Sequence, residues 1–483
     1  MRNVELLING RSVPARHSAT FDRIDPFTGE IATRTAAASI EDADDAAAAA
    51  QAAFPAWSSL PAIERRSRLN AAADALESLA SEFIATGISE TGGTGGWFGF
   101  NVMLAASMMR EAASMTTQIS GEVLPSAVPG STAMAVRRPC GVMLGIAPWN
   151  APVILGVRAV AMPLACGNTV VLKASETCPG VHRLIGDALQ RGGVGDGVVN
   201  VITNAPADAP AIVERLIAHP AVRRINFTGS TAVGKKVAQI AAAHLKPVLL
   251  ELGGKAPLLV LEDADLDAAA AAANFGAFAN QGQICMSTER IIVDKKIASD
   301  FIQKLEARAR SLSAVDPRRP DAVLGAMVSS EAASRVQSLI DDATSKGARV
   351  VIAGKHDGVL MQPTIIDQVT PAMRIYSEES FGPVVAVIHT DGDDEAVRVA
   401  NDSPYGLSAA VFSRDTTRAL GVAGRIDSGI CHVNGPTVHD EANMPFGGVK
   451  DSGYGRFGGK AAIAEFTDLR WITVQSGTRH YPF

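Results

Sequence analysis

From Cys140 onward the chain alternates between short apolar runs and longer segments with apolar residues at helical spacing. The apolar runs predict buried strands at residues 141–147, 169–173, 198–203, 222–227 and 248–252. Helices are predicted between several of them, at residues 182–191, 209–218 and 231–243. Buried strands separated by amphipathic helices predict a parallel sheet in an α/β fold.

A second α/β block is predicted to begin near Asp263, where Asp265 can cap an alanine-rich helix. Its strands are expected at residues 290–293, 349–353 and 384–389, and its helices at 298–312 and 331–346. The first hundred residues predict three further helices, at 40–54, 62–78 and 80–90. Residues 466–474 predict an extended strand without a later helix to cover it, so pairing with another subunit is expected.

Length and composition indicate a soluble globular protein of two or three domains. The chain has 483 residues, 47% of them hydrophobic and 19% charged. The net charge of −6 has no basic block, which argues against nucleic acid or an anionic membrane as a partner. Residues 138–173 contain few charges, but prolines and glycines interrupt them, so we expect strands and a helix rather than a membrane span. The N-terminal residues lack the apolar region of a signal peptide.

The cysteines point to a reducing cytoplasm. There are five, an odd number, without the spacing of a disulfide framework or a zinc site, so we expect no metal. Four of them are interpreted as small buried hydrophobic residues. Cys285 differs, because it lies between a predicted helix and a predicted strand and follows Gly282, which permits a close backbone approach. A thiol is a good nucleophile near neutral pH, so Cys285 is the candidate nucleophile.

Several polar residues at the ends of predicted strands are further candidates. Glu251 ends an apolar strand, where burial can raise the pKa of a carboxyl group toward that of a general base. Gly229 and Ser230 follow another strand and open a helix, which fits either a phosphate site or an ordinary helix cap. Lys173 and Glu176 can reach a ribose or form a solvated turn. Asn150 can donate to an oxyanion or serve as a turn residue.

Together these segments resemble the NAD(P)-dependent aldehyde dehydrogenase superfamily over essentially the whole chain. The motifs that carry the resemblance, in order, are Pro148-Trp149-Asn150, Lys173-Ala174-Ser175-Glu176, Phe227-Thr228-Gly229-Ser230, Glu251-Leu252-Gly253-Gly254-Lys255, Gly282-Gln283-Ile284-Cys285, Glu379-Ser380-Phe381-Gly382-Pro383, and Asn434 with Pro445-Phe446-Gly447-Gly448. The resemblance implies an aldehyde dehydrogenase-like α/β fold. It has a Rossmann-type NAD-binding domain at 1–119 and 141–253 and a catalytic domain at 254–452. A bridging β element at 120–140 and 466–483 implies a homodimer or homotetramer.

The resemblance also implies catalytic roles. Cys285 attacks the aldehyde carbon, and the Asn150 amide with the Cys285 N–H holds the oxyanion of the thiohemiacetal. Its collapse sends a hydride to the nicotinamide and leaves a thioester, which water activated by Glu251 hydrolyses. Glu176 would repel a 2′-phosphate, so NAD is expected rather than NADP. The implied cofactor-binding residues are Ile146, Pro148, Trp149, Lys173, Glu176, Phe227, Gly229, Ser230, Val233, Leu252, Glu379 and Phe381.

The substrate pocket is inferred by alignment with the family. Its expected residues are Trp97, Ile154, Arg158, Ile284, Met286 and Phe446, with Phe98 beside Trp97 near the entrance. Many relatives have an apolar or aromatic residue where this chain has Arg158, which here forms either a substrate contact or a structural ion pair. An aromatic aldehyde is expected, with salicylaldehyde favoured and a vanillin, benzaldehyde or broad-specificity enzyme as the alternative. Three other interpretations are less favoured. A CoA-acylating enzyme would lack Glu251, and a non-catalytic protein would not need Cys285. A thiol esterase without redox chemistry would have no use for Glu176 and Glu379.

Overall fold

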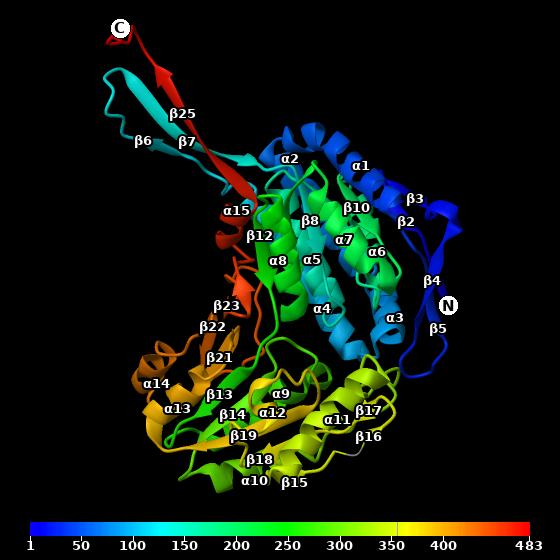
Figure 1. The fold of residues 1–483 in the computed structure, drawn as a ribbon, viewed down its shortest axis with the longest axis vertical. Coiled ribbons are helices and arrows are strands. Elements are labelled where there is room, and N and C mark those ends of the chain that lie inside the picture. Colours follow the sequence, from blue (N-terminus) through cyan, green and yellow to red (C-terminus); the bar gives the residue numbers. More distant parts are fainter. Residues whose placement is uncertain (355) are drawn as a thin grey trace.

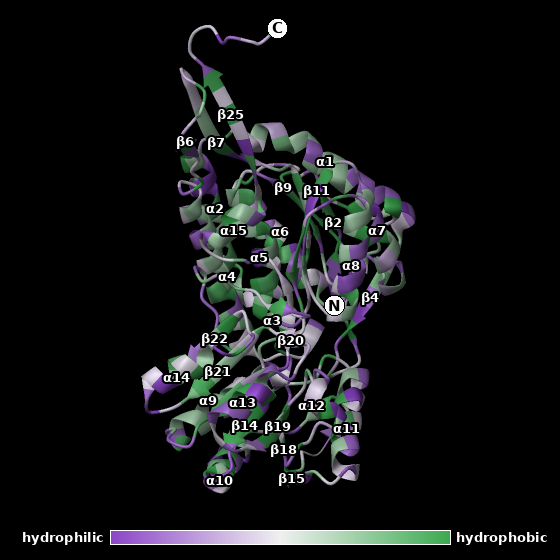
Figure 2. Cartoon of the chain, turned by 60° about the vertical axis from the view of Figure 1, so that its left-hand side comes forward, coloured by the Kyte–Doolittle hydropathy of each residue, from purple (hydrophilic) through white to green (hydrophobic). Residues whose placement is uncertain are grey.

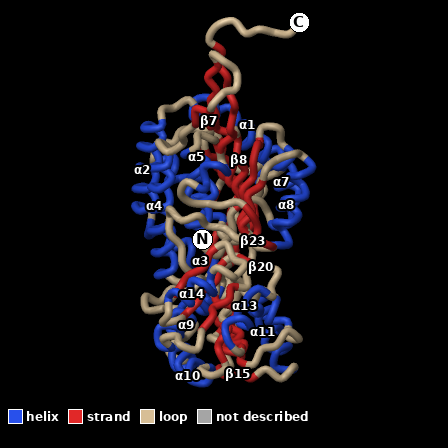
Figure 3. The backbone as a smooth tube through the Cα atoms, turned by 90° about the vertical axis from the view of Figure 1, so that its left-hand side faces the viewer, coloured by secondary structure: helices blue, strands red, loops and turns tan. Residues whose placement is uncertain are grey.

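The computed structural model describes residues 1–354 and 356–483, and two large sheets organise them (Figure 1). Each sheet lies between two layers of helices, as the tube in Figure 3 shows from the side. Helix α1 (Ile40–Ser58) carries both hydrophobic and hydrophilic residues (Figure 2), and the buried Ala43, Ala46, Ala47 and Ala50 recur at the spacing expected for a helix with one buried face. None of the helices in the described residues is both long and apolar enough to cross a membrane. The predicted α/β fold is confirmed.

The first large sheet has eight strands in the order β24-β12-β11-β8-β9-β10-β2-β3. Its five parallel strands are β8 (Val142–Ile146), β9 (Thr169–Lys173), β10 (Val199–Ile202), β11 (Val222–Thr228) and β12 (Val248–Glu251). The antiparallel edge strands are β2 (Leu6–Ile8), β3 (Arg11–Val13) and β24 (Gly453–Tyr454). All five strands predicted for this region are confirmed.

Alternating side chains of this sheet pack against two groups of helices. One face packs on α1, α7 (Ala209–Ala218) and α8 (Thr231–Ala243). The other face packs on α5 (Pro152–Ala165) and α6 (Pro179–Arg191), and these two helices are covered in turn by α2 (Ala62–Ser78), α3 (Ala80–Thr91) and α4 (Gly95–Met115). Helix α5 occupies the weakly charged stretch that resembled a membrane span, and all of its residues are buried in the core. Helix α4 was not predicted, because its glycine-rich start obscures the helical pattern.

The second large sheet has seven strands in the order β15-β18-β19-β14-β13-β21-β22. Their bounds are Arg349–Ile352 for β15, Thr364–Asp367 for β18, Val384–Thr390 for β19, Thr288–Asp294 for β14, Ala256–Val260 for β13, Ser408–Phe412 for β21 and Ile430–Val433 for β22. One face packs on α9 (Leu266–Phe278) and α10 (Ala298–Ala309), the other on α11 (Ser330–Ser345), α13 (Gly392–Asn401) and α14 (Thr416–Ala423). Asp265 caps α9 as predicted, accepting hydrogen bonds from the N–H groups of Asp267 and Ala268.

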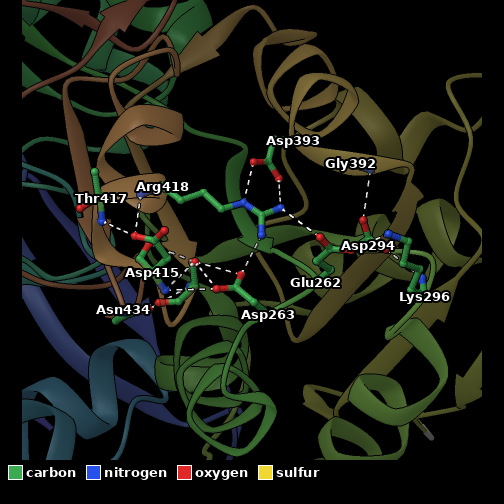
Figure 4. Close-up of polar contacts among 11 residues, drawn as sticks. Glu262, Asp263, Asp294, Lys296, Gly392, Asp393, Asp415, Thr417, Arg418 and Asn434 are labelled. Atoms are coloured by element: carbon green, nitrogen blue, oxygen red, sulfur yellow. Dashed lines mark hydrogen bonds and ion pairs between the residues drawn. The ribbon is translucent and has the colours of Figure 1, made fainter.

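A cluster of charged residues fixes the helices at one end of this sheet (Figure 4). Arg418 of α14 donates to both carboxylate oxygens of Asp393, in the first turn of α13, at 2.7 and 2.6 Å. It also donates to Asp263, in the loop after β13, at 3.1 Å. Asp263 in turn accepts from the Ser413 hydroxyl at 2.8 Å, so one arginine joins three segments that are distant in the sequence.

A small sheet projects from the body at the top of Figure 1. It consists of β6 (Glu122–Leu124), β7 (Ser131–Pro139) and β25 (Thr467–Gln475). Strand β25 runs antiparallel to β7 from Thr467 opposite Pro139 to Gln475 opposite Ser131. The strand predicted at 466–474 is confirmed, but it pairs with β7 of its own chain and not, as expected, with another subunit.

The remaining elements are short. They are β1 (Arg2–Val4), β4 (Thr20–Ile24), β5 (Ile31–Ala36), β16 (His356–Asp357), β17 (Leu360–Met361), β20 (Tyr405–Gly406), β23 (Val449–Lys450), α12 (Arg374–Ser377), α15 (Ala461–Glu465) and the 3-10 turns Arg16–Ser18, Pro206–Asp208 and Ala279–Gly282.

Candidate active site

Two large cavities meet at Cys285. One has a volume of about 910 Å³ and the other about 960 Å³, and Cys285 lies in the wall of both. Asn150 and Leu155 are also shared by the two walls. A thiol at such a junction can be approached by one molecule from each side.

The backbone before Cys285 turns tightly between α9 and β14. Asn280, Gln281 and Gly282 all have positive φ angles, of 47°, 55° and 67°. A Cβ atom on Gly282 would lie 2.1 Å from the carbonyl oxygen of Gly382, so only glycine fits there. The close approach predicted for Gly282 is therefore a contact with the protein's own backbone.

The Cys285 thiol lies in a mostly buried and negatively charged environment. Burial raises its pKa well above the usual range, and the carboxyl groups of Glu251 and Glu379 raise it further. Arg158 acts in the opposite direction, and Asp440 adds to the increase. The thiol is therefore protonated in this state, and it must lose its proton before it can act as a nucleophile.

Glu251 is a buried carboxyl group at the end of β12. Burial raises its pKa to about 8, against the effect of Arg158 and Arg456. In the described part of the chain, neither of its oxygens has a hydrogen-bond partner. An unpartnered carboxyl group with a pKa near neutrality is suited to accept a proton from water.

Asn150 is held through its backbone. Its carbonyl oxygen accepts hydrogen bonds from the Trp97 indole and from the Asn280 side chain, both at 3.0 Å. No hydrogen bond from its side-chain amide to another described residue is formed, so that amide can donate to a ligand beside Cys285.

The 960 Å³ cavity brings together all twelve residues predicted to bind the cofactor, along with Glu251. Its volume is within the range of about 300–1,000 Å³ that is typical of ligand and cofactor sites. Ser230 caps α8 by accepting from the N–H of Val233 at 3.4 Å, so it is a helix cap and also part of the cavity wall. A Cβ atom on Gly229 would lie 2.6 Å from the Phe227 ring. A helix N-terminus approached through a glycine fits a dinucleotide phosphate.

The two ends of this cavity have different chemistry. At one end Glu176 accepts hydrogen bonds from Lys173 and, at 3.0 Å, from the amide of Asn204. At the other end the rings of Trp149 and Phe381 meet edge to face, with centroids 5.7 Å apart. A charged, hydrogen-bonded end fits a ribose, and an aromatic end fits a flat ring.

Glu379 is positioned by a buried polar network. It accepts the N–H of Gly254 at 2.8 Å, and burial, followed by the charge of Glu289, raises its pKa to about 7. Glu289 accepts the N–H groups of Ser380 and Phe381 and a 2.5 Å hydrogen bond from Lys255. The network fixes the backbone that presents Glu379 and Phe381 to the cavity.

The 910 Å³ cavity is lined by all six residues predicted for the substrate pocket, together with Phe100, Phe275 and Phe278. Arg158 forms a buried ion pair with Asp440, and its guanidinium lies 4.1 Å from the centre of the Phe446 ring. The ion pair expected in one of the two interpretations of Arg158 is present, and Arg158 also lines the cavity, so a contact with the substrate stays a prediction. Phe98 is fully buried in the core against α3, so its expected place near the entrance is wrong.

Comparisons with known proteins agree with this geometry. The model of the aldehyde dehydrogenase family matches residues 13–472. The chain belongs to the aldehyde dehydrogenase family. It is 65% identical over 482 residues to vanillin dehydrogenase of Pseudomonas fluorescens, covering 100% of both chains, and 48% identical over 480 residues to salicylaldehyde dehydrogenase of Pseudomonas putida, covering 99% of both. The crystal structure of a salicylaldehyde dehydrogenase from Pseudomonas putida G7, complexed with salicylaldehyde, superposes with a TM-score of 0.98 at 47% identity, covering 100% of each chain.

As an aldehyde dehydrogenase, the protein is an oxidoreductase that acts on aldehydes. Three residues of its site were not predicted from sequence: Asn204 beside Glu176, Asn280 beside Asn150, and Asp440 beside Arg158. None of the three belongs to the motifs that carry the family resemblance. Each contacts a partner that is distant in sequence, so no local signal marks it.

Proposed function

We propose that this aldehyde dehydrogenase oxidises a ring-substituted aromatic aldehyde to the carboxylic acid, with NAD as the hydride acceptor. The observation that carries the proposal is the position of Cys285 between an aromatic cavity and a cavity with a phosphate-type helix N-terminus. The first cavity suits a benzene ring, and the second suits a dinucleotide.

The residues in place support the following chemistry. The Cys285 thiolate adds to the aldehyde carbon, while the Asn150 amide donates to the oxygen that becomes negative. A nicotinamide held at the end of the second cavity that Trp149 and Phe381 form would supply the acceptor for the hydride of this carbon, and Cys285 would then carry the acyl group as a thioester. Glu251 then takes a proton from water as the water attacks the thioester, which releases the acid and restores the thiol.

The substrate proposal favours a vanillin-type aldehyde. The chain is 65% identical to a vanillin dehydrogenase and 48% identical to a salicylaldehyde dehydrogenase, so similarity supports vanillin above the salicylaldehyde expected first. The cavity combines aromatic walls with the polar Arg158–Asp440 pair, which suits a ring with oxygen substituents. NAD is proposed because the carboxylate of Glu176 would repel a 2′-phosphate.

The domain division, the oligomeric state and the cellular location are also proposals. We propose the domain division expected from sequence, with residues 120–140 and 466–483 as an oligomerisation element that forms a homodimer or homotetramer. Strand β25 exposes Trp471 (76% exposed) and Leu469 on this element, which supports contact with a second subunit. The five cysteines are free, which supports a reducing cytoplasm as the location.

A panel of kcat/KM values tests the proposal, using vanillin, salicylaldehyde, benzaldehyde and hexanal with NAD and with NADP. We expect vanillin with NAD to exceed hexanal by roughly tenfold or more, because ring burial contributes a few kcal/mol. A preference for hexanal would overturn the aromatic assignment. Hydrolysis of aryl esters without any NADH formation would instead indicate a thiol esterase.

A further inference from the structure

His182 of α6 is a fully buried histidine whose ring contacts the loop at the edge of the cofactor cavity. Its Nδ1 accepts a 3.0 Å hydrogen bond from the backbone N–H of Ser175. Ser175 is buried and lies in the wall of the 960 Å³ cavity, between Lys173 and Glu176. The N–H of Ala174 still pairs with strand β10, at 2.9 Å, so the Ser175 N–H is the first to leave the sheet. A buried N–H needs an acceptor, and the imidazole supplies one where the strand ends.

The hydrogen bond fixes the tautomer of the ring. A backbone N–H can donate only to a nitrogen that carries no hydrogen, so the hydrogen of the neutral imidazole is on Nε2. Burial, followed by the charge of Lys173, lowers the pKa of His182 to about 3. The ring is therefore neutral near pH 7 and keeps its acceptor for Ser175.

Close packing holds the ring and its helix in place. A Cβ atom on Gly156 of α5 would lie 3.1 Å from the His182 ring, so the two helices meet at this point. The carboxylate of Glu90, from α3, accepts the N–H groups of Gly180 and Val181 at 2.8 and 3.1 Å. The first turn of α6 is thus fixed from a second direction, and His182 is a rigid support for the loop.

We propose that His182 is a positioning residue, which holds the loop of Ser175 so that Lys173 and Glu176 meet a ribose of NAD. The inference rests on the proposed function, because it takes the 960 Å³ cavity as the NAD site. Glu176 accepts hydrogen bonds from Lys173 and from Asn204, so a rotation of the Ser175 peptide would displace a connected set of side chains. A purely structural histidine would stabilise the fold without changing the affinity for NAD.

Two variants of nearly equal shape test this proposal in the full-length enzyme. His182→Leu keeps the branching of the side chain but cannot accept a hydrogen bond, whereas His182→Asn places an amide oxygen where Nδ1 lies. Calorimetric titration with NAD should give a Kd raised about tenfold for His182→Leu and within about threefold of the wild type for His182→Asn. With saturating NAD, kcat of His182→Leu should stay within about twofold of the wild type, because the loss is one of cofactor binding.

The control for lost stability is Leu189→Ala, which opens a space in the core about two turns further along α6. It should lower Tm and leave the Kd for NAD unchanged. A double-mutant cycle follows the route of the effect. In the Glu176→Ala background, His182→Leu should raise the Kd by less than about threefold, because the residue through which it acts is gone.

An unchanged Kd in His182→Leu overturns the inference, as do equal losses in the leucine and asparagine variants or full additivity with Glu176→Ala. Thermal unfolding shows whether each variant is folded. If His182→Leu does not fold, His182→Gln replaces it, since its amide reaches the position of Nε2 instead of Nδ1, and it should bind NAD more weakly than His182→Asn. If the wild type binds no NAD, the proposed function itself fails. If it binds NAD and the His182 variants bind equally well, only this inference fails.

Discussion

The indole N–H of Trp97 donates a 3.0 Å hydrogen bond to the backbone carbonyl of Asn150. Trp97 lies in the wall of the aldehyde cavity, and Asn150 borders both cavities. The hydrogen bond therefore joins the residue that forms the pocket wall to the residue proposed to hold the oxyanion.

Trp97→Phe should lower kcat by about tenfold, because small displacements of an oxyanion donor are costly. The ring remains, so KM for an aromatic aldehyde should change little. Phe100→Leu, which alters a neighbouring aromatic residue 5.7 Å from the Trp97 ring without touching Asn150, is the control. Steady-state kinetics with benzaldehyde measure both variants. A rise in KM with unchanged kcat would limit Trp97 to substrate binding.

Cys285→Ser should abolish aldehyde oxidation, because a hydroxyl group is a much weaker nucleophile than a thiolate. NAD binding should remain, since the cofactor cavity is formed mostly by other residues. Cys431→Ser, at a partly buried cysteine of the second sheet, serves as the control and should retain activity. Calorimetric titration with NAD and an NADH absorbance assay separate the two effects. Near-native turnover by the Cys285 variant would contradict the assignment.

Glu251→Gln should produce a burst of NADH followed by slow turnover, because an amide cannot take a proton from water. In the wild type, hydrolysis of the thioester should rise with pH through about 8, where Glu251 loses its proton. Stopped-flow measurements between pH 6 and 9, run alongside the conservative variant Glu251→Asp, resolve the two phases. Steady turnover without a burst would remove Glu251 from the deacylation step.

The same carboxyl group affects stability. Its pKa is raised from 4.5 to about 8 by burial, so the folded protein holds a proton that the unfolded chain releases between these values. The free energy of unfolding contributed by Glu251 therefore falls as pH rises from about 4.5 to 8. Glu251→Gln removes this effect, and its Tm should exceed that of the wild type by roughly 2 °C or more at pH 9 but not at pH 4.5. Thermal scans across this pH range provide the measurement, and a constant difference in Tm would contradict the burial argument.

Glu176→Gln should improve the use of NADP relative to NAD by about tenfold, because one negative charge near the 2′ position is lost. A glutamine has the shape of the glutamate that it replaces and can still accept the hydrogen bond from Asn204. Asn204→Ala is the matched variant, since it releases Glu176 without removing its charge. The ratio of kcat/KM for the two cofactors measures the effect. A wild type that already prefers NADP would overturn the role of Glu176.

Much of the fold was predictable because buried strands and amphipathic helices leave periodic patterns. Strands β8 to β12 and helix α8 follow from their own residues. Helix α4 could not be predicted in this way, because Gly95, Gly96 and Gly99 disfavour a helix. Tertiary packing nevertheless stabilises it. The site motifs also follow from sequence, since strand ends and a glycine before Cys285 are local signals.

The partners of these motifs could not be predicted in the same way. Asp440 is 282 positions from Arg158, and Asn280 is 130 positions from Asn150. Such pairs form because the two sheets bring particular loops together in space. A single sequence does not show which loops are close in the fold. The pKa of Glu251 was predictable in direction from its apolar strand, but the absence of any hydrogen-bond partner among the described residues is a property of the folded site.

The pairing of β25 with β7 affects how the chain folds while the ribosome synthesises it. The hydrogen bond between Arg137 and Thr467 joins residues 330 positions apart. During synthesis, β7 therefore emerges from the ribosome long before the strand that covers it. Until then its edge offers unpaired N–H and C=O groups to any extended chain nearby. Exposed, newly made β7 is thus a point at which nascent chains can associate wrongly, and slower translation of the second half of the protein lengthens that exposure.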